Sequence, residues 1–369
     1  MLSEKKPIYL DHAATTFPEE AVVKAMAQCM RAVPYNASAA YDAAGEARRI
    51  QRLCRSQIAS MLACDPAQIL FTSGGTEANN QAVFSFAGEH VVLSAIEHAS
   101  IIEAAKAAGC RISLALPDHN GVVSAESIAR ALRPETKLIC LMAANNETGV
   151  LQPLEAVHAL AKQCRIHLHV DAVQAFGHVP VSSRFCDSMS LSAHKLYGPR
   201  GAGALYVRSG ASIRPLLYGG GQERGLRAGT ENTPALCGFY VAAQMADADI
   251  QLRMERESML LRAFVSRLQA ALPDLTLLGS SAERLPGVCA LHVPGVSAER
   301  LIAALDLQGV LISGGAACAA HSGAPSHVYT AMGFSKEEAA CVVRISIGRH
   351  TTQEELDAAA AAFESVIRR

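Results

Sequence analysis

Between about residues 65 and 207, short runs of aliphatic and β-branched residues alternate with longer segments of helical spacing. The candidate strands of this region are Ile69–Thr72, Val91–Leu93, Ile112–Leu116, Leu138–Met142, His167–Val170 and Ala202–Val207. Strands that alternate with helices are joined by crossover connections, and such connections produce a mostly parallel sheet. The sequence therefore predicts an α/β fold for this part of the chain.

A second block follows a long helical segment that covers about residues 234–272 and ends before Pro273. Beyond it the pattern predicts strands at Leu275–Leu278, Val288–Val293, Val310–Ser313 and Val342–Ile347, with helices between them. Capping-box patterns at Ser335–Glu338 and Thr351–Glu354 predict two helix starts. We expect a second, smaller α+β domain here, with a boundary near residue 255.

Composition excludes several classes of protein. Half of the 369 residues are hydrophobic and 18% are charged, which indicates a globular chain. Lysine and arginine number 33 against 34 acidic residues, so charge gives no reason to expect nucleic acid or a membrane as a partner. No apolar stretch is long enough to span a bilayer, and the first residues lack the apolar core of a signal peptide. We expect a cytoplasmic protein.

The eleven cysteines are scattered, and none forms a C-x-x-C pair. Structural zinc and iron–sulfur sites usually show such pairs, so the sequence predicts no metal site. An odd number of dispersed thiols is typical of a reducing compartment rather than of a disulfide framework.

The first candidate functional motif is the glycine turn of Thr72–Asn79, in which a predicted strand leads through Gly74 and Gly75 into a helix. Such a turn points free backbone N–H groups at an anion, and Ser73 and Thr76 add hydroxyl donors. The spacing matches neither a P-loop nor a dinucleotide-binding loop. Alone, the motif could equally be an ordinary strand–helix turn.

Two further motifs place an acid and a lysine after predicted strands. Asp171 ends the strand 167–170, where α/β sheets place their ligands, although it could also cap the next segment. Lys195 follows a short β-like run and precedes a Gly-Pro turn, so its position is fixed, and such a lysine can form a Schiff base with an aldehyde. An anion cradle, an acid for a pyridinium nitrogen and a Schiff-base lysine together suit pyridoxal 5'-phosphate (PLP).

Cys318 is the thiol that differs from the other ten. Small residues surround it in the segment 314–323, a composition suited to a loop, whereas Cys140 sits inside an apolar strand. Cys318 is therefore the candidate nucleophile.

These motifs, in this order, resemble the NifS/IscS-type cysteine desulfurases of the class V aminotransferase family, PLP enzymes of fold type I. The segments that carry the resemblance are 9–16 (YLDHAATT), 72–77 (TSGGTE), 144–149 (ANNETG), 171–174 (DAVQ), 192–195 (SAHK), 219–232 (GGGQERGLRAGTEN), the Cys318 loop and 344–349 (RISIGR). The resemblance implies a seven-stranded, mostly parallel sheet in a large domain. It also implies an N-terminal arm, 1–15, that packs with a small domain, 256–369, which carries the cysteine loop, and a large domain of residues 16–255.

The resemblance also implies residue roles. Lys195, Cys318 and His98 would be catalytic, with Lys195 holding PLP and moving the Cα proton of the substrate. The implied cofactor-binding residues are Gly75, Thr76, His98, Asn146, Asp171, Gln174, Ser192, His194, Lys195 and Thr230, and the implied substrate-binding residues are Asn146 and Arg344. Thr230 would reach the PLP phosphate of a second subunit, which implies a homodimer. Arg344 would hold the substrate carboxylate in a bidentate fork.

The implied reaction converts L-cysteine to L-alanine. The Cys318 thiolate attacks the substrate sulfur and keeps it as a persulfide, for transfer to an acceptor protein or a small thiol in an iron–sulfur or thiolation pathway. A cationic neighbour such as His321 or His98 would favour the thiolate.

Three departures from the family pattern bear on this hypothesis. The family loop Ser-Ser-Gly-Ser-Ala-Cys is Ser313–Cys318 here and lacks two hydroxyls, and the family stretch Asn-Pro-Ser-Ser-x-His is Asn36–Tyr41 and lacks its proline and histidine. The given chain also ends at Arg369 without the tail by which some members dock a scaffold. We expect changes in substrate preference, rate or acceptor.

Rival hypotheses stay open. Another class V reaction is one: selenocysteine lyase, cysteine sulfinate desulfinase or an aminotransferase. A non-catalytic persulfide carrier is another, but it would not need Lys195, Asp171 and His98 together.

Overall fold

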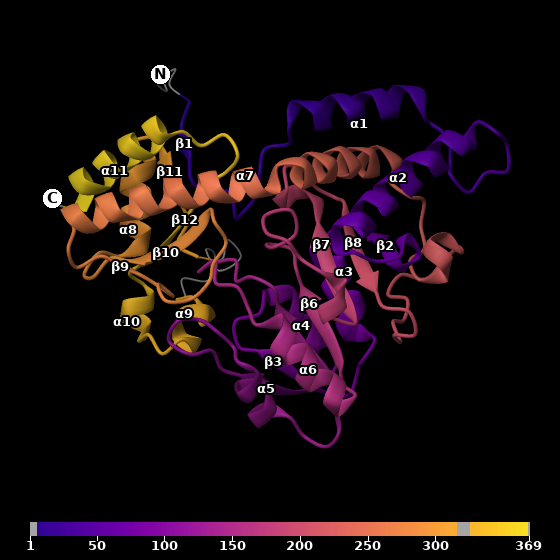
Figure 1. Ribbon diagram of the computed structural model, residues 1–369, viewed down its shortest axis with the longest axis horizontal. Coiled ribbons are helices and arrows are strands. Elements are labelled where there is room, and N and C mark those ends of the chain that lie inside the picture. The colour runs from indigo at the N-terminus through magenta and orange to yellow at the C-terminus, as the bar shows by residue number, and fades with distance from the viewer. Residues whose placement is uncertain (1–5, 316–324, 368–369) are drawn as a thin grey trace.

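The computed structural model describes residues 6–315 and 325–367 (Figure 1). Its largest sheet has seven strands in the order β2-β8-β7-β6-β5-β3-β4. The strands are β2 (Ile69–Thr72), β3 (His90–Ser94), β4 (Arg111–Ala115), β5 (Thr136–Met142), β6 (His167–Asp171), β7 (Ser188–Ser192) and β8 (Gly203–Val207). All neighbours pair in parallel except that β8 runs antiparallel to both β2 and β7. The predicted mostly parallel, seven-stranded α/β sheet is confirmed.

One strand of this sheet, β7, has a sequence that does not read as a buried strand. Its residues are Ser-Met-Ser-Leu-Ser, and all five are buried. Six of the seven strands are predicted individually from their apolar residues, whereas β7 is predicted only as a short β-like run before Lys195. The burial of its serines cannot be predicted from the strand's own sequence, because a hydroxyl is buried only where it has hydrogen-bond partners, and these partners lie on other strands.

Helices cover the sheet and join it to the rest of the molecule. They are α1 (Glu20–Ala32), α2 (Ala44–Leu62), α3 (Gly75–Phe84), α4 (Ala99–Ala107), α5 (Ala125–Ala131), α6 (Leu154–Cys164) and α7 (Thr233–Ala271). Short 3₁₀ turns lie at η1 (Pro66–Gln68), η2 (Ser183–Phe185), η3 (Ala193–Lys195) and η4 (Gln222–Gly225). Figure 1 shows α7 extending without interruption from α1 and α2 to the C-terminal elements. In the described part of the chain, no helix is both long and apolar enough to cross a membrane.

The C-terminal elements form the smaller α+β domain. Its helices and strands are β9 (Thr276–Leu277), β10 (Val288–His292), α8 (Ala298–Asp306), β11 (Val310–Leu311), α9 (His327–Ala331), α10 (Lys336–Ala339), β12 (Val342–Ser346) and α11 (Gln353–Ile367). The strands β12, β10 and β9 form an antiparallel sheet in that order. The N-terminal strand β1 (Ile8–Tyr9) pairs in parallel with β11. The domain limits at residues 15 and 255 stay predictions, and α7 passes through the second of them.

The two predicted capping boxes have different outcomes. Ser335 and Glu338 form one at α10, as predicted. The prediction at Thr351 and Glu354 is wrong by one residue, because Thr352 and Glu355 exchange the side-chain and backbone bonds at the start of α11. Thr351 instead accepts a hydrogen bond from the Gly348 N–H, so its hydroxyl serves the preceding turn.

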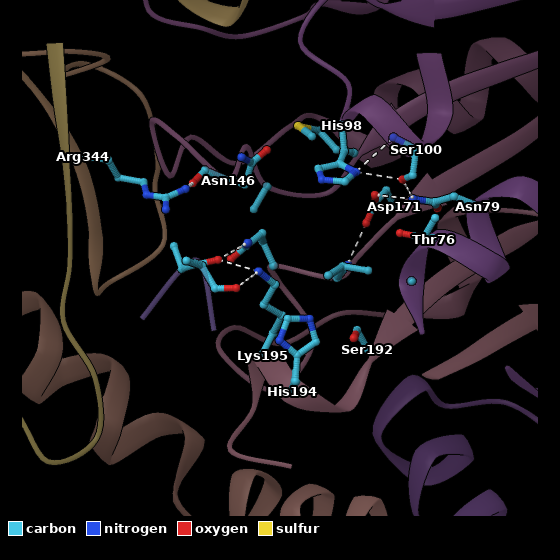
Figure 2. Close-up of a pocket in the computed structure, with 17 residues that line it drawn as sticks. Thr76, Asn79, His98, Ser100, Asn146, Asp171, Ser192, His194, Lys195 and Arg344 are labelled. Carbon is cyan, nitrogen blue, oxygen red and sulfur yellow. Dashed lines mark hydrogen bonds between the residues drawn. The ribbon is translucent and has the colours of Figure 1, made fainter. Parts of the chain in front are cut away.

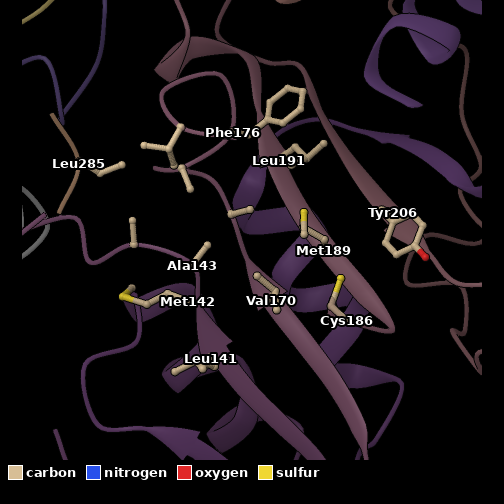
Figure 3. Packing of buried hydrophobic residues seen from close by; sticks show 14 of the residues in the cluster. Leu141, Met142, Ala143, Val170, Phe176, Cys186, Met189, Leu191, Tyr206 and Leu285 are labelled. Atoms are coloured by element: carbon tan, nitrogen blue, oxygen red, sulfur yellow. The ribbon is translucent and has the colours of Figure 1, made fainter. Parts of the chain in front are cut away.

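The buried core divides into clusters that follow the two sheets. Figure 3 shows side chains of the large cluster on β5, β6, β7 and β8, among them Leu141, Val170, Met189, Leu191 and Tyr206. A second cluster joins the C-terminal part of α7, β10, β12, α8 and α11, and it includes Leu10 from the N-terminal segment. The apolar side chain at position 10 thus anchors the start of the chain in the smaller domain's core.

Candidate active site

A cavity of about 290 Å³ opens at the carboxyl ends of β5, β6 and β7 (Figure 2). This is the edge at which parallel α/β sheets place their ligands. Its wall is completed by the start of α3, by residues 13 and 14, and by β12. The lining residues are Ala13, Ala14, Gly75, Thr76, Asn79, His98, Ser100, Met142, Ala144, Asn146, Asp171, Val173, Gln174, Ser192, His194, Lys195 and Arg344.

This cavity gathers ten of the residues that the sequence singled out: Gly75, Thr76, His98, Asn146, Asp171, Gln174, Ser192, His194, Lys195 and Arg344. Thr230 does not line it and is exposed. Cys318 and His321 lie outside the described residues.

Lys195 ends the short turn η3, directly after β7, and its side chain is held by the N-terminal segment. Its Nζ donates to the carbonyl oxygens of Ala13 at 2.6 Å and Ala14 at 2.8 Å. The Gln174 amide donates to the same Ala13 oxygen at 2.9 Å. The position of the lysine head therefore depends on residues that precede the large sheet.

Asp171, the last residue of β6, is buried and has two fixed hydrogen bonds. Its Oδ1 accepts from the Val173 N–H at 2.9 Å, so it does cap the following turn. Its Oδ2 accepts from Asn79 Nδ2 at 2.7 Å. The carboxylate thus serves the local turn and still faces the cavity, which reconciles the two interpretations of this residue.

His98 caps the start of α4 and faces the cavity from the side of Asp171 (Figure 2). Its Nδ1 lies 2.8 Å from Ser100 Oγ and accepts from the Ser100 N–H at 3.1 Å. Burial lowers the pKa of His98, and the Asp171 charge opposes this effect only in part. The imidazole is therefore neutral at neutral pH.

The anion end of the cavity is formed by the start of α3 together with Thr76, Ser192 and His194. Helix α3 begins at Gly75 and presents its N-terminus there. Burial lowers the pKa of His194 to about 4, so it presents a neutral ring whose Nδ1 bonds to Thr15 Oγ1 at 3.1 Å.

Arg344 on β12 brings the smaller domain to the cavity. It is 2% exposed, and its Nη1 donates to the Asn146 carbonyl oxygen at 2.9 Å. Its Nη2 donates to Asp11 Oδ1 at 2.7 Å. Asp11 lies in the motif 9–16, but nothing in the sequence indicates which cation it pairs with, so no role could be predicted for it.

The residues around this cavity fit PLP. A lysine can bind its aldehyde, a buried carboxylate can meet its pyridine nitrogen, and hydroxyls with a helix N-terminus can hold its phosphate. The glycine turn is also closely packed, because a Cβ added at Gly75 would lie 2.5 Å from Val173 Cγ2. In the described part of the chain, no group of three or more His, Cys, Asp or Glu side chains is arranged to hold a metal ion.

Comparisons with known proteins agree with this geometry. The family model of class V aminotransferases matches residues 8–359. The cysteine desulfurase IscS of Dictyoglomus turgidum is 36% identical, over 98% of this chain and 95% of its own. A solved NifS-like protein superposes with a TM-score of 0.91 at 31% identity, covering 98% of this chain and 99% of its own. The structure of SspA in complex with cysteine has a TM-score of 0.78 at 31% identity and covers 92% of this chain and 98% of its own.

Proposed function

The chain belongs to the class V aminotransferase family, and from this premise we propose that it is a cysteine desulfurase that converts L-cysteine to L-alanine. The observation that carries the proposal is the single cavity that joins Lys195, Asp171, His98 and Arg344. The full-length similarity to proteins named cysteine desulfurases supports the choice among class V reactions.

PLP is the cofactor that this family uses, and when bound it supplies a sink for the electron pair left at the substrate Cα. Gly75, Thr76, Ser192 and His194 would hold its phosphate. Asp171 would keep the pyridine nitrogen protonated, His98 would lie on the ring, and Gln174 and Asn146 would lie at its edge.

Lys195 and Arg344 would act on two different groups of the substrate, the Cα–H and the carboxylate. Lys195 is the proposed acceptor of the Cα proton, because the carbonyl oxygens of Ala13 and Ala14 hold its Nζ at the cavity. Arg344 binds the substrate carboxylate, and Asp11 holds the guanidinium in place for it. A lysine at position 344 could not reproduce a planar fork that meets several oxygens at once.

Cys318 is the proposed sulfur acceptor within the protein. The residues on either side of its segment lie near Glu147: a Cβ at Gly315 would lie 2.6 Å from Glu147 Oε2, and the Ser326 side chain bonds to the same carboxyl group. Glu147 adjoins the cavity-lining Asn146. Attack by the Cys318 thiolate forms an S–S bond and breaks the Cβ–S bond. Two thiols thus become one persulfide and one methyl group, and no external oxidant or reductant is needed.

The decisive measurement is alanine formed from L-cysteine by the wild type, Cys318→Ala and Cys164→Ala. Cys164 is an exposed thiol at the end of α6 and serves as the matched control. We expect a loss of at least about 100-fold for Cys318→Ala and none for Cys164→Ala, with an added sulfur atom on the Cys318 peptide by mass spectrometry. Full activity of Cys318→Ala would favour a lyase or transaminase reaction, and no alanine from any form would overturn the assignment.

We further propose that the enzyme is a cytoplasmic homodimer that delivers sulfur to an acceptor protein or small thiol. Support for the dimer comes from the segment before Thr230, where Leu217 and Tyr218 are 43% and 82% exposed. An exposed Thr230 that does not line its own cavity suits a role in the partner's site. A molecular mass near 39 kDa in light scattering would contradict the dimer.

A further inference from the structure

A chain of hydrogen-bonded side chains leaves the cavity and runs through the interior of the large sheet. It joins α4 and α3 to β6 and β7, and its central members Asn79, His169 and Ser188 are at most 1% exposed. The bonds are His98 Nδ1–Ser100 Oγ (2.8 Å), Ser100 Oγ–Asn79 Nδ2 (2.8 Å), Asn79 Nδ2–Asp171 Oδ2 (2.7 Å), Asn79 Oδ1–His169 Nε2 (3.1 Å), His169 Nδ1–Ser188 Oγ (2.8 Å) and Ser188 Oγ–His167 Nε2 (2.7 Å). Figure 2 shows the end at the cavity.

The direction of each hydrogen bond follows from the Asp171 carboxylate. An ionised carboxylate only accepts hydrogen bonds, so the group of Asn79 that faces it is the NH₂. The carbonyl oxygen of the same amide then faces His169 Nε2, which has to donate.

The neutral His169 ring carries a proton on only one of its two nitrogens. Burial lowers its pKa to about 3, and the neighbouring His167 adds to the effect, so the ring is neutral at neutral pH. With the proton on Nε2, Nδ1 accepts from the Ser188 hydroxyl, whose oxygen accepts from His167 Nε2. The Ser190 hydroxyl, 3.3 Å from His169 Nε2, shares the same proton.

The other branch reaches His98. Ser100 Oγ accepts from Asn79 Nδ2, and its own hydrogen is therefore available for His98 Nδ1. The Ser100 N–H donates to this nitrogen as well. Neutral His98 thus carries its proton on Nε2, the nitrogen that Ser100 does not occupy.

An asparagine amide can rotate by half a turn and exchange its two ends, and only its partners choose between them. The rotated Asn79 would place its oxygen against the Asp171 carboxylate, acceptor against acceptor. The N–H of His169 makes this state unfavourable because it would then face the NH₂ group. In a variant without the His169 N–H, only Asp171 still favours the observed orientation of the Asn79 amide.

We propose that His169 is a positioning residue that acts through Asn79 to hold the Asp171 carboxylate in place. The inference rests on the proposed function, since Asp171 and His98 are the residues expected to contact PLP. It assigns a role to a histidine that lies two residues before Asp171 on β6 and does not line the cavity.

The test compares His169→Leu and His169→Gln with His90→Leu as the matched control. His90 is another fully buried histidine of the same sheet, bonded to the hydroxyls of Thr136 at 2.8 Å and Ser113 at 3.0 Å. For His169→Leu we expect the PLP dissociation constant to rise by about tenfold and kcat to fall more than KM changes, with an altered cofactor absorption spectrum. His169→Gln, whose amide can donate to Asn79, should recover most of the PLP affinity and of kcat. His90→Leu should lose stability only.

A second measurement reads the proton directly. Nitrogen NMR of histidine-labelled protein, with and without PLP, should show His169 protonated on Nε2 in the wild type, as its bond to the Asn79 carbonyl oxygen requires. His98 should be protonated on Nε2 in both the wild type and His169→Leu, because the Ser100 N–H donates to its Nδ1. The proposal fails if wild-type His169 carries its proton on Nδ1, if His169→Leu behaves like His90→Leu, or if His169→Gln is as impaired as His169→Leu. PLP affinity and the tautomer do not require turnover, so a failure of the desulfurase assignment would be seen separately, as missing alanine.

Discussion

Glu97 is a fully buried carboxyl group next to His98 that does not itself line the cavity. Its Oε1 accepts from Ser94 Oγ and from the Met142 N–H, both at 2.7 Å. Burial, with a smaller contribution from the Asp171 charge, raises the pKa of Glu97 from 4.5 to about 8, and these two hydrogen bonds oppose the shift only in part. The side chain is therefore protonated at neutral pH and adds no charge beside the cavity.

This pKa predicts how stability depends on pH. Between pH 4.5 and pH 8 the folded chain keeps a proton on Glu97 that the unfolded chain has released, so this residue's contribution falls as pH rises through that window. Glu97→Gln removes the effect. Urea unfolding should show the variant gaining on the wild type by on the order of 3 kcal/mol between pH 5 and pH 8.

The control for this prediction is Glu103→Gln, at a side chain that is 65% exposed. Its stability should stay within about 0.5 kcal/mol of the wild type at both pH values. A difference between Glu97→Gln and wild type that does not change with pH would contradict a protonated Glu97.

At the same scale, the residues that the family resemblance implies could be found in the sequence because each lies in a short motif, and ten of them line the cavity. Asn79 and Asp11 are different. Asn79 ends the glycine-turn motif, but its partner Asp171 lies 92 residues further along the chain. Asp11 pairs with Arg344, which lies 333 residues away. Only the fold brings such pairs together, so their roles could not be predicted from the sequence.

Among the elements, β8 limits the shape of the glycine turn before α3. It returns antiparallel between β2 and β7, and its first residue, Gly203, lies against the backbone of Gly74. A Cβ added at Gly203 would lie 2.6 Å from Gly74 Cα and 2.7 Å from the Leu191 carbonyl oxygen. Because both neighbours are backbone, neither can move without shifting β7 or the turn.

Gly203→Ala should therefore destabilise the chain by about 1–3 kcal/mol and weaken PLP binding through the displaced turn. Gly45→Ala is the control, because α2 leaves its Cβ position open, with the nearest atom 3.8 Å away. This control should be stabilised by about 0.5–1 kcal/mol. Thermal unfolding and PLP titration measure both effects, and unchanged values for Gly203→Ala would show that the turn can adapt.

The elements were predictable wherever an apolar pattern defines them. The bounds of α7 and of six large-sheet strands differ from the predictions by at most two residues. The prediction was least specific where polar side chains are buried, as in β7, because their burial depends on hydrogen-bond partners such as His169. The start of α11 shows a smaller limit: two adjacent threonines fit the same capping pattern, and only the turn at Gly348 distinguishes them.

In the whole molecule, the N-terminal segment connects the smaller domain to Lys195. Leu10 is fully buried in the core of that domain, and three residues later the Ala13 carbonyl accepts from Lys195. The Ala13 N–H in turn donates to Ser346 Oγ on β12. A substitution of Leu10 should thus alter how the Lys195 side chain is held, although Leu10 does not line the cavity.

Leu10→Ala should cost about 2–5 kcal/mol in the free energy of unfolding and also weaken PLP retention. Leu301→Ala removes an equally buried leucine of the same cluster, on α8, and should cost a similar amount without affecting PLP. Denaturant unfolding and PLP release during dialysis compare the two variants. Equal PLP retention by both would show that the segment does not control the lysine.

The pairing of this segment also orders events during synthesis. Residues 8–14 leave the ribosome long before their partners, since His12 and Ser346 are 334 residues apart. The large sheet, complete by Val207, can form while these first residues still lack their partners on β11 and β12. Translation thus completes β7, the strand before Lys195, long before it supplies Ser346, which holds Ala13 in place. A partly synthesised chain can therefore contain the whole large sheet while the cavity around Lys195 is still incomplete.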